Sequence, residues 1–298
     1  MAAARTATAP AATALAAIDL AAIDLVATDL DGTLLRSDGR ISDRTRSALA
    51  LARRSGLRVI AVTGRPAVQA RALTAGAGLD WLAVCANGAE ICDLPRGRPL
   101  RRDYLPSAAA RDLISRLRAS VPEAAVAWED HRGQGGPVPG LARAALPPVP
   151  VAKLLIRRRG LPAADLAAAV TAAAAAGLTV TWSTGGTVEV LGPGVSKGAA
   201  LARLAGWLGI GLDRVLAIGD GHNDLPMLAI AGGAAAVANA PAPVLAAAGL
   251  ITASSDEDGV AQLLERLTAA RAVRAGPDTK GASRQWPYDS GSSDAARS

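Results

Sequence analysis

The stretch AAIDLAAIDLVATDLDGTLL, residues 16–35, contains three similar pentapeptides in succession, each with an aspartate at its fourth position. These aspartates are Asp19, Asp24 and Asp29, and only the third is followed by Leu-Asp-Gly-Thr. A five-residue repeat cannot keep one face of a strand whose side chains alternate with period two. We therefore expect Asp29 to end a short buried strand, Asp24 to mark its start and Asp19 to belong to a disordered lead-in.

Apolar strands and amphipathic helices alternate after this first strand. Strands are predicted at 57–63, 81–86, 214–220 and 234–238, and helices at 42–56, after Pro66, at 196–209, 224–233 and 242–249, and after Gly259. Ser42 and Ser196 are expected N-caps of their helices, and Gly56 ends the first one. This alternation predicts an α/β fold with a Rossmann-like, doubly wound parallel sheet as its core.

The middle of the chain has a different character. It contains Pro- and Gly-rich stretches and a second set of helix and strand patterns at 107–120, 151–158, 163–177, 178–184 and 186–191. We expect an inserted α/β cap domain at 94–190, which leaves a discontinuous core domain at 23–93 and 191–270. The Ala/Thr-rich residues 1–22 and the Gly/Ser-rich tail 271–298 are predicted to be disordered.

Composition limits the class of protein. The 298 residues suit two domains or one large one, and they are 50% hydrophobic but only 2% aromatic, with no Phe, so the core must be built from Ala, Val, Leu and Ile. The net charge of +6 comes from scattered arginines, and the longest basic run, 157–159, has no interleaved aromatics. We therefore expect no nucleic-acid partner. No apolar run reaches the roughly 18 residues of a membrane span, so no membrane partner is expected.

The two cysteines, Cys85 and Cys92, flank a turn signal at 87–88. A hairpin centred on that turn places Cys85 opposite Glu90 and Cys92 opposite Ala83. The two thiols are then not cross-strand partners, and two cysteines are too few for a disulfide scaffold. We expect both to be reduced and the protein to be cytoplasmic.

Acidic residues follow the predicted strands where a functional site is expected. Sites of parallel α/β sheets lie beyond the carboxyl ends of the strands, and Asp29, Asp31, Asp220 and Asp224 all fall there. Four carboxylates repel one another unless a cation lies among them, and a hard divalent cation with oxygen ligands, Mg²⁺ first, fits this need. Lys197 adds a second positive charge at a helix N-terminus, which favours anions. The combination predicts a phosphate site with covalent transfer through an aspartyl-phosphate.

Four segments resemble, in order and spacing, the motifs of the haloacid dehalogenase-like phosphatases: DLDGTLL (29–35), VTGR (62–65), GVSKGAAL (194–201) and GDGHNDLPML (219–228). ANGAEI (86–91) and DEDGVAQLL (256–264) resemble further stretches of the Cof-type branch. That branch carries a large α/β cap between its second and third motifs, where the inserted module is expected. The resemblance covers nearly all of 23–270.

The resemblance implies a role for each matching residue. Asp29 would be the nucleophile, and Asp31 would protonate the leaving oxygen and then deprotonate the hydrolytic water. Asp31 would need a carboxyl that is protonated near neutral pH. Thr63 would hydrogen-bond a phosphoryl oxygen, and Lys197 would neutralise phosphoryl charge.

The same resemblance implies the binding residues. Mg²⁺ would be held by Asp29, Asp220 and the backbone carbonyl of Asp31, with Asp224 supporting the metal shell or orienting Lys197. Substrate and phosphate contacts are expected from the following residues: Leu30 through its backbone, Thr63, Gly64, Arg65, Asn87, Lys197 and Asn223. We expect His222 to be a bystander or a substrate contact, and substrate selection to involve the cap residues 128–131.

These features predict a Mg²⁺-dependent phosphatase that hydrolyses a small phosphorylated metabolite, such as a sugar phosphate. The alternatives are a phosphotransferase or mutase that uses the same aspartyl-phosphate, and a non-catalytic phosphometabolite-binding protein. A binding protein has no need for both Asp29 and Asp31.

Overall fold

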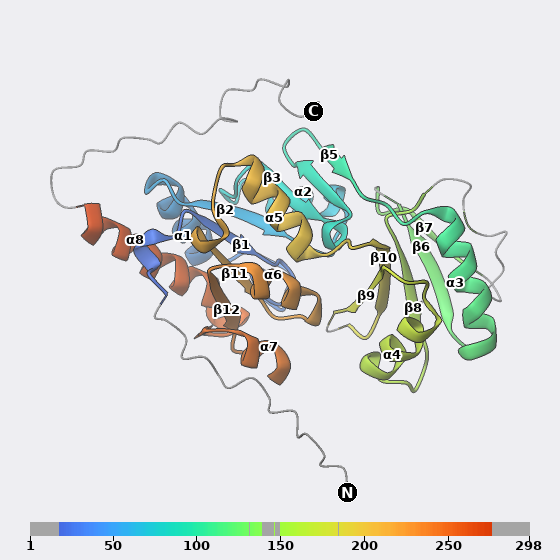
Figure 1. The fold of residues 1–298 in the computed structure, drawn as a ribbon. Helices are drawn as coiled ribbons and strands as arrows, with labels where there is room; N and C mark the ends of the chain where they lie inside the picture. Colours follow the sequence, from blue (N-terminus) through green and yellow to red (C-terminus); the bar gives the residue numbers. More distant parts are fainter. Residues whose placement is uncertain (1–17, 131, 139–145, 147–149, 184, 276–298) are drawn as a thin grey trace, which may run out of the picture.

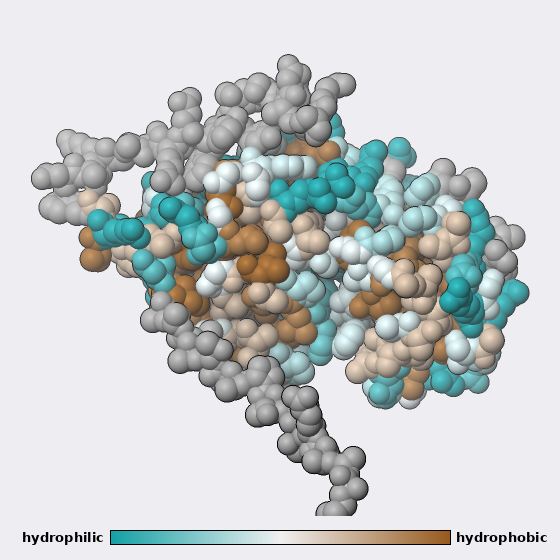
Figure 2. All heavy atoms as spheres, in the orientation of Figure 1, coloured by the Kyte–Doolittle hydropathy of each residue, from teal (hydrophilic) through white to brown (hydrophobic). Residues whose placement is uncertain are grey.

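The chain folds into two modules that lie side by side (Figure 1). The computed structural model describes residues 18–275 except 131, 139–145, 147–149 and 184. One module contains an eight-stranded sheet and the other a five-stranded sheet. None of the described helices is long and apolar enough to cross a membrane. Hydrophilic and hydrophobic residues are interspersed over the visible face of both modules (Figure 2).

The core sheet has the strand order β13-β12-β11-β1-β2-β3-β4-β5. Its strands are β1 (Leu25–Thr28), β2 (Arg58–Val62), β3 (Leu82–Cys85), β4 (Glu90–Asp93), β5 (Arg98–Arg102), β11 (Val215–Gly219), β12 (Gly233–Val237) and β13 (Leu250–Thr252). The six strands from β13 to β3 are parallel, whereas β4 and β5 extend the sheet antiparallel. The predicted parallel sheet is confirmed, with a β-hairpin added at one edge.

Helices cover both faces of the core sheet. On one face are α1 (Asp43–Arg54), α2 (Ala67–Thr74) and α8 (Gly259–Ala275), and on the other α5 (Lys197–Trp207), α6 (Leu225–Ile230) and α7 (Ala242–Ala247). Short 3₁₀ turns connect them: η1 (Leu20–Ala22), η2 (Ala86–Gly88), η5 (Leu212–Arg214), η6 (His222–Asp224) and η7 (Ser255–Glu257). Two aliphatic cores result, one on each side of the sheet, and the fold is doubly wound as predicted.

Local sequence signals determine several of these elements. The Ser42 and Ser196 side chains accept hydrogen bonds from the backbone of Thr45 and Ala199, so both predicted N-caps are confirmed. The hairpin register pairs Ala83 with Cys92 and Cys85 with Glu90, as the turn position predicted. Both cysteines are buried and free.

The cap sheet is antiparallel, with the order β7-β6-β8-β10-β9. Its strands are β6 (Ala125–Glu129), β7 (Gly135–Pro137), β8 (Lys153–Arg157), β9 (Leu178–Trp182) and β10 (Val188–Pro193). Helices α3 (Ser107–Ser120) and α4 (Ala163–Ala173) pack on one face of this sheet through a third apolar cluster. The opposite face of β6, β8 and β10 is turned toward the core module (Figure 1).

Three boundaries differ from those predicted. Strand β5 pairs with β4, so the core sheet continues to residue 102 instead of ending at 93. At the amino end, Asp19 caps η1, and Ile18 and Leu20 pack against the core, so regular structure begins before residue 23. At the carboxyl end, α8 continues to Ala275. Residues 1–17 and 276–298, where disorder was predicted, lie outside the described residues.

Candidate active site

Three aspartates meet at the carboxyl edge of the core sheet. Asp29 follows β1 and Asp220 follows β11, and these neighbouring strands pair Thr28 with Ile218. Asp224 reaches the same point from η6. One carboxylate oxygen from each of Asp29, Asp220 and Asp224 lies within 4.8 Å of the others, and all three residues are buried.

Lys197 bridges two of these carboxylates. Its Nζ lies 2.8 Å from Oδ1 of Asp29 and 2.6 Å from Oδ1 of Asp224. The side chain is fully buried, because the Ser196 cap starts α5 directly beneath the sheet edge. Burial alone would lower the pKa of Lys197, but the charges of Asp224 and Asp29 outweigh it and the pKa is raised. Lys197 therefore stays protonated at the centre of the site.

Asp224 has both carboxylate oxygens engaged. Its Oδ1 binds Lys197, while its Oδ2 accepts hydrogen bonds from the backbone N–H groups of Asp220 at 3.0 Å and Gly221 at 2.8 Å. A Cβ at position 219 would approach the Asp224 carboxylate to 2.4 Å, so Gly219 is required there. Asp224 thus holds the loop after β11 and orients Lys197.

Asp29 and Asp220 each keep one oxygen available. Asp29 Oδ1 binds Lys197 and Asp220 Oδ1 accepts from Thr33 Oγ1 at 2.8 Å, whereas neither Oδ2 has a hydrogen bond to the described part of the chain. Burial raises the pKa of Asp29 well above its usual value, although Lys197 acts against this, and burial raises the pKa of Asp220 to about 6.

This donor set fits a hard divalent cation. Two desolvated carboxylates with free oxygens gain most from an ion that takes oxygen ligands, as Mg²⁺ does. The space beside Asp220 depends on Gly32, since a Cβ there would lie 2.5 Å from Asp220 Oδ2.

The Asp31 carboxylate lies outside this cluster. It forms a two-pronged ion pair with Arg65, from Nη2 to Oδ1 at 2.6 Å and from Nε to Oδ2 at 2.7 Å. Half of the Asp31 side chain is exposed, and Arg65 Nη1 also donates to Gln69 at 3.3 Å. The fourth predicted aspartate therefore does not bring its carboxylate to the other three.

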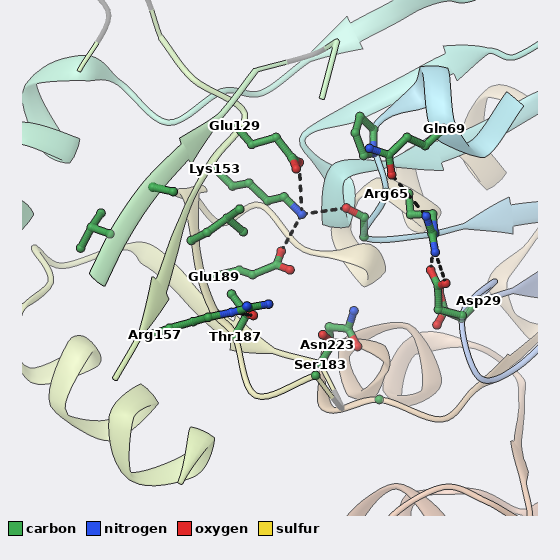
Figure 3. Close-up of a pocket in the computed structure, with 18 of the residues that line it drawn as sticks. Asp29, Arg65, Gln69, Glu129, Lys153, Arg157, Ser183, Thr187, Glu189 and Asn223 are labelled. Carbon is green, nitrogen blue, oxygen red and sulfur yellow. Dashed lines mark hydrogen bonds and ion pairs between the residues drawn. The ribbon is translucent and has the colours of Figure 1, made fainter. Parts of the chain in front are cut away.

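A cavity of about 740 Å³ lies between the core and the cap (Figure 3). The predicted residues that line it are Asp29, Asp31, Gly64, Arg65, Asp220 and Asn223. Leu30 and Thr63 are buried behind its wall, and Thr63 Oγ1 accepts from the backbone N–H of Arg65 at 3.1 Å. Asn87 and Lys197 line a second cavity of about 230 Å³, together with Asn223 and His222. His222 stacks on Trp182 of the cap, with ring centroids 4.5 Å apart.

The cap contributes cavity residues that the sequence analysis did not identify. Lys153 and Arg157 project from β8 and Glu189 from β10, while Glu129 of β6 falls within the predicted segment 128–131. Lys153 and Arg157 lie four residues apart in one strand, and this spacing was a usable signal, since every second residue of a strand shares one face. His131 lies outside the described residues.

Comparison with known proteins agrees with the geometry. The family model described as haloacid dehalogenase-like hydrolase matches residues 26–132 and 144–264. The chain belongs to this family, and it is of the Cof type that its sequence motifs resemble. The enzyme class that these matches support is a phosphatase.

Curated relatives and solved structures cover most of the chain. The phosphatase YwpJ of Bacillus subtilis is 28% identical over 80% of this chain and 97% of its own length. The pyridoxal phosphate phosphatase YbhA of Escherichia coli is 29% identical over 78% of this chain and 94% of its own length. A crystal structure from Streptococcus mutans superposes with a TM-score of 0.73 at 25% identity, covering 83% of this chain and 99% of the other.

Proposed function

We propose that the protein is a Mg²⁺-dependent phosphatase that hydrolyses a small phosphorylated metabolite through an aspartyl-phosphate on Asp29. The observation that carries this proposal is the arrangement around Lys197. The lysine binds one oxygen of Asp29, and the other oxygen is left without a hydrogen bond to the described residues, on a side chain that lines the cavity. A carboxylate held in this way is a positioned nucleophile.

In the proposed first step, an Asp29 oxygen attacks phosphorus and the bond to the leaving oxygen breaks. Asp31 gives its proton to that oxygen. In the second step, water attacks phosphorus, Asp31 takes a proton from the water, and Asp29 is released together with inorganic phosphate. Asp31 must exchange its ion pair with Arg65 for a proton before the first step, which frees Arg65 to contact the substrate.

Asp29, Asp220 and the backbone carbonyl of Asp31 would hold Mg²⁺. When bound there, the ion supplies positive charge that lets a carboxylate and a phosphoryl group approach each other. Lys197 has two carboxylate acceptors for its three N–H groups, so one N–H remains for a phosphoryl oxygen. Thr63 and the backbone of Leu30 would complete this electrostatic stabilisation.

Further phosphate or leaving-group contacts are proposed for Gly64, Arg65, Asn87 and Asn223, which lie around the same cavities. The cap closes one side of the larger cavity, and this favours a small substrate over a macromolecule. A sugar phosphate or a similar phosphate monoester is the proposed class. A cytoplasmic location is proposed as well, and it fits two cysteines that are buried and free.

The test is a panel of phosphorylated metabolites with the wild-type protein and the Asp29→Asn variant. We expect turnover with Mg²⁺, near-complete loss in EDTA and near-complete loss in the variant. Release of phosphate to water, with no second phosphorylated sugar when two sugars are present, separates hydrolysis from transfer. Wild-type protein that turns over no panel member with Mg²⁺ would overturn the proposal.

A further inference from the structure

A buried polar chain runs from the cap into the phosphate site. Lys153 of β8 and Glu189 of β10 lie on the cap side, while Asn87 and Asn223 lie on the core side. All four residues are buried. Figure 3 shows Lys153 at the centre of the cap part, pointing toward Glu129, Glu189 and a main-chain oxygen of the core.

Lys153 lines the cavity, and its ammonium donates hydrogen bonds to Gly64 and Glu189 and forms an ion pair with Glu129. Its ammonium lies 2.8 Å from the Gly64 carbonyl oxygen, 3.0 Å from Glu189 Oε2 and 3.3 Å from Glu129 Oε1. An ammonium has three N–H groups, and three acceptors surround this one. Burial disfavours the charge, but Glu189 and Glu129 outweigh it, and the pKa of Lys153 is raised. Lys153 therefore favours its charged form, and it ties the cap to the loop containing Gly64.

Glu189 links Lys153 to the core by a hydrogen bond with Asn87. Its Oε2 also accepts from Asn87 Nδ2 at 2.6 Å, and Asn87 Oδ1 accepts from Asn223 Nδ2 at 3.0 Å. Asn87 reaches both partners from a left-handed backbone conformation with φ 55°, which asparagine tolerates better than most residues. Gly64 leaves room for the Asn87 amide, since a Cβ there would lie 3.1 Å from Asn87 Oδ1.

Each hydrogen bond in this chain can run in only one direction from donor to acceptor. An ionised carboxylate only accepts hydrogen bonds, so Asn87 must present its NH₂ group to Glu189 and its oxygen to Asn223. Asn223 must then present its own NH₂ group to Asn87. Its Oδ1 lies on the Gly221 side, where a Cβ would approach it to 2.3 Å. Turning either amide over would place two acceptors against each other.

We propose that Lys153 and Glu189 are positioning residues for the phosphate site, which fix the Asn223 amide through Asn87 so that its second N–H is available to a phosphoryl oxygen. Lys153 holds the Glu189 carboxylate in place, and Glu189 sets the direction of both amides. The effect on turnover rests on the proposed phosphatase function, whereas the amide orientation and phosphate affinity do not.

A matched pair of variants isolates this role. Glu189→Gln and Glu129→Gln each remove one carboxylate charge from Lys153, but only residue 189 contacts Asn87. A glutamine at position 189 can donate as well as accept, so the direction of the hydrogen bonds between residues 189, 87 and 223 is no longer fixed. Asn87→Ala cuts the chain on the core side and leaves the Lys153 ion pairs in place.

The measurements are the affinity for inorganic phosphate with Mg²⁺ present, kcat/KM on the best panel substrate, and the side-chain amide signals of Asn223 in ¹H–¹⁵N spectra. We expect Glu189→Gln and Asn87→Ala each to weaken phosphate affinity roughly five- to tenfold, the effect of one hydrogen bond, with Glu129→Gln below about twofold. The double variant of residues 87 and 189 should be no weaker than Asn87→Ala alone. The Asn223 signals should shift or split in Glu189→Gln but not in Glu129→Gln.

Equal phosphate affinities for the two glutamine variants, or additive losses in the double variant, would overturn the proposal. Unchanged Asn223 signals in Glu189→Gln would also overturn it. If the wild type binds phosphate and shows this pattern but hydrolyses no substrate, the phosphatase proposal fails and the positioning role stands. Thermal unfolding of every variant separates loss of affinity from loss of folded protein.

Discussion

Replacing Lys197 by methionine tests the electrostatics of the site directly. Methionine keeps the length and apolar stem of lysine but leaves Asp29 and Asp224 buried without their shared cation. Removing one partner of a buried ion pair typically costs about 3–5 kcal/mol of unfolding free energy. Asp224 retains its two backbone hydrogen bonds, so the larger share of the cost falls on Asp29.

The assay is urea unfolding followed by circular dichroism at pH 7.5 in EDTA, for the variant and the wild type. We expect Lys197→Met to lose about 3–5 kcal/mol and to lose activity about 10²–10³-fold, the range for one lost transition-state contact. The stability loss should shrink at pH 5.5, because burial raises the pKa of Asp29 and a neutral carboxyl needs no partner.

Two controls make the result decisive. The double variant Lys197→Met/Asp224→Asn removes one of the stranded charges, so it should be more stable than the single variant and equally inactive. Arg44→Met breaks an ion pair with Glu265 in which both side chains are more than 40% exposed, and it should cost less than about 1 kcal/mol. A single variant as stable as the Arg44 control, or a double variant no more stable than the single one, would refute the reasoning.

Three further predictions follow from the same structure. The pKa of Asp220 is about 6 in the folded protein and about 4 in the unfolded chain. Protonated Asp220 therefore contributes about 3 kcal/mol to the free energy of unfolding below pH 4, and this contribution is lost as the pH rises through about 6. Unfolding in EDTA should show the loss, and Mg²⁺ should raise stability at pH 7.5 more than at pH 5. Gly32→Ala should abolish Mg²⁺-dependent stabilisation in calorimetry, because its Cβ meets Asp220 and its φ is +73°. Deleting residues 1–22 removes the packing of Ile18 and Leu20, so it should lower the Tm by a few degrees, and an unchanged melting curve would show that η1 adds nothing.

The sequence was sufficient to bring the core aspartates together, because the ends of two strands determine where they lie. Asp29 and Asp220 come directly after β1 and β11, and parallel neighbours bring their carboxyl ends together whatever the details of packing. Lys197 was recognisable for a similar reason, since a serine cap fixes where its helix begins. These positions needed only a correct order of strands.

The cap residues that line the cavity could not be predicted in the same way. Glu129 lies opposite Lys153, and Glu189 lies opposite Leu155, only because three antiparallel strands adopt one particular register. A shift of one residue would turn every one of these side chains to the other face. Nor did the sequence show that Asp31 pairs with Arg65, because their two loops meet only after β1 and β2 are aligned.

The two buried lysines of this protein differ in their contacts, and this difference underlies the two roles proposed for them. Both Lys153 and Lys197 contact two carboxylates, and the pKa of each is raised by them. Lys153 also donates a hydrogen bond to the Gly64 carbonyl oxygen, whereas Lys197 has no third acceptor among the described residues. The contacts with Gly64, Glu189 and Glu129 hold Lys153 between the cap and the core. The unfilled donor of Lys197, beside a carboxylate with a free oxygen, is what suits the core site to the proposed phosphoryl transfer.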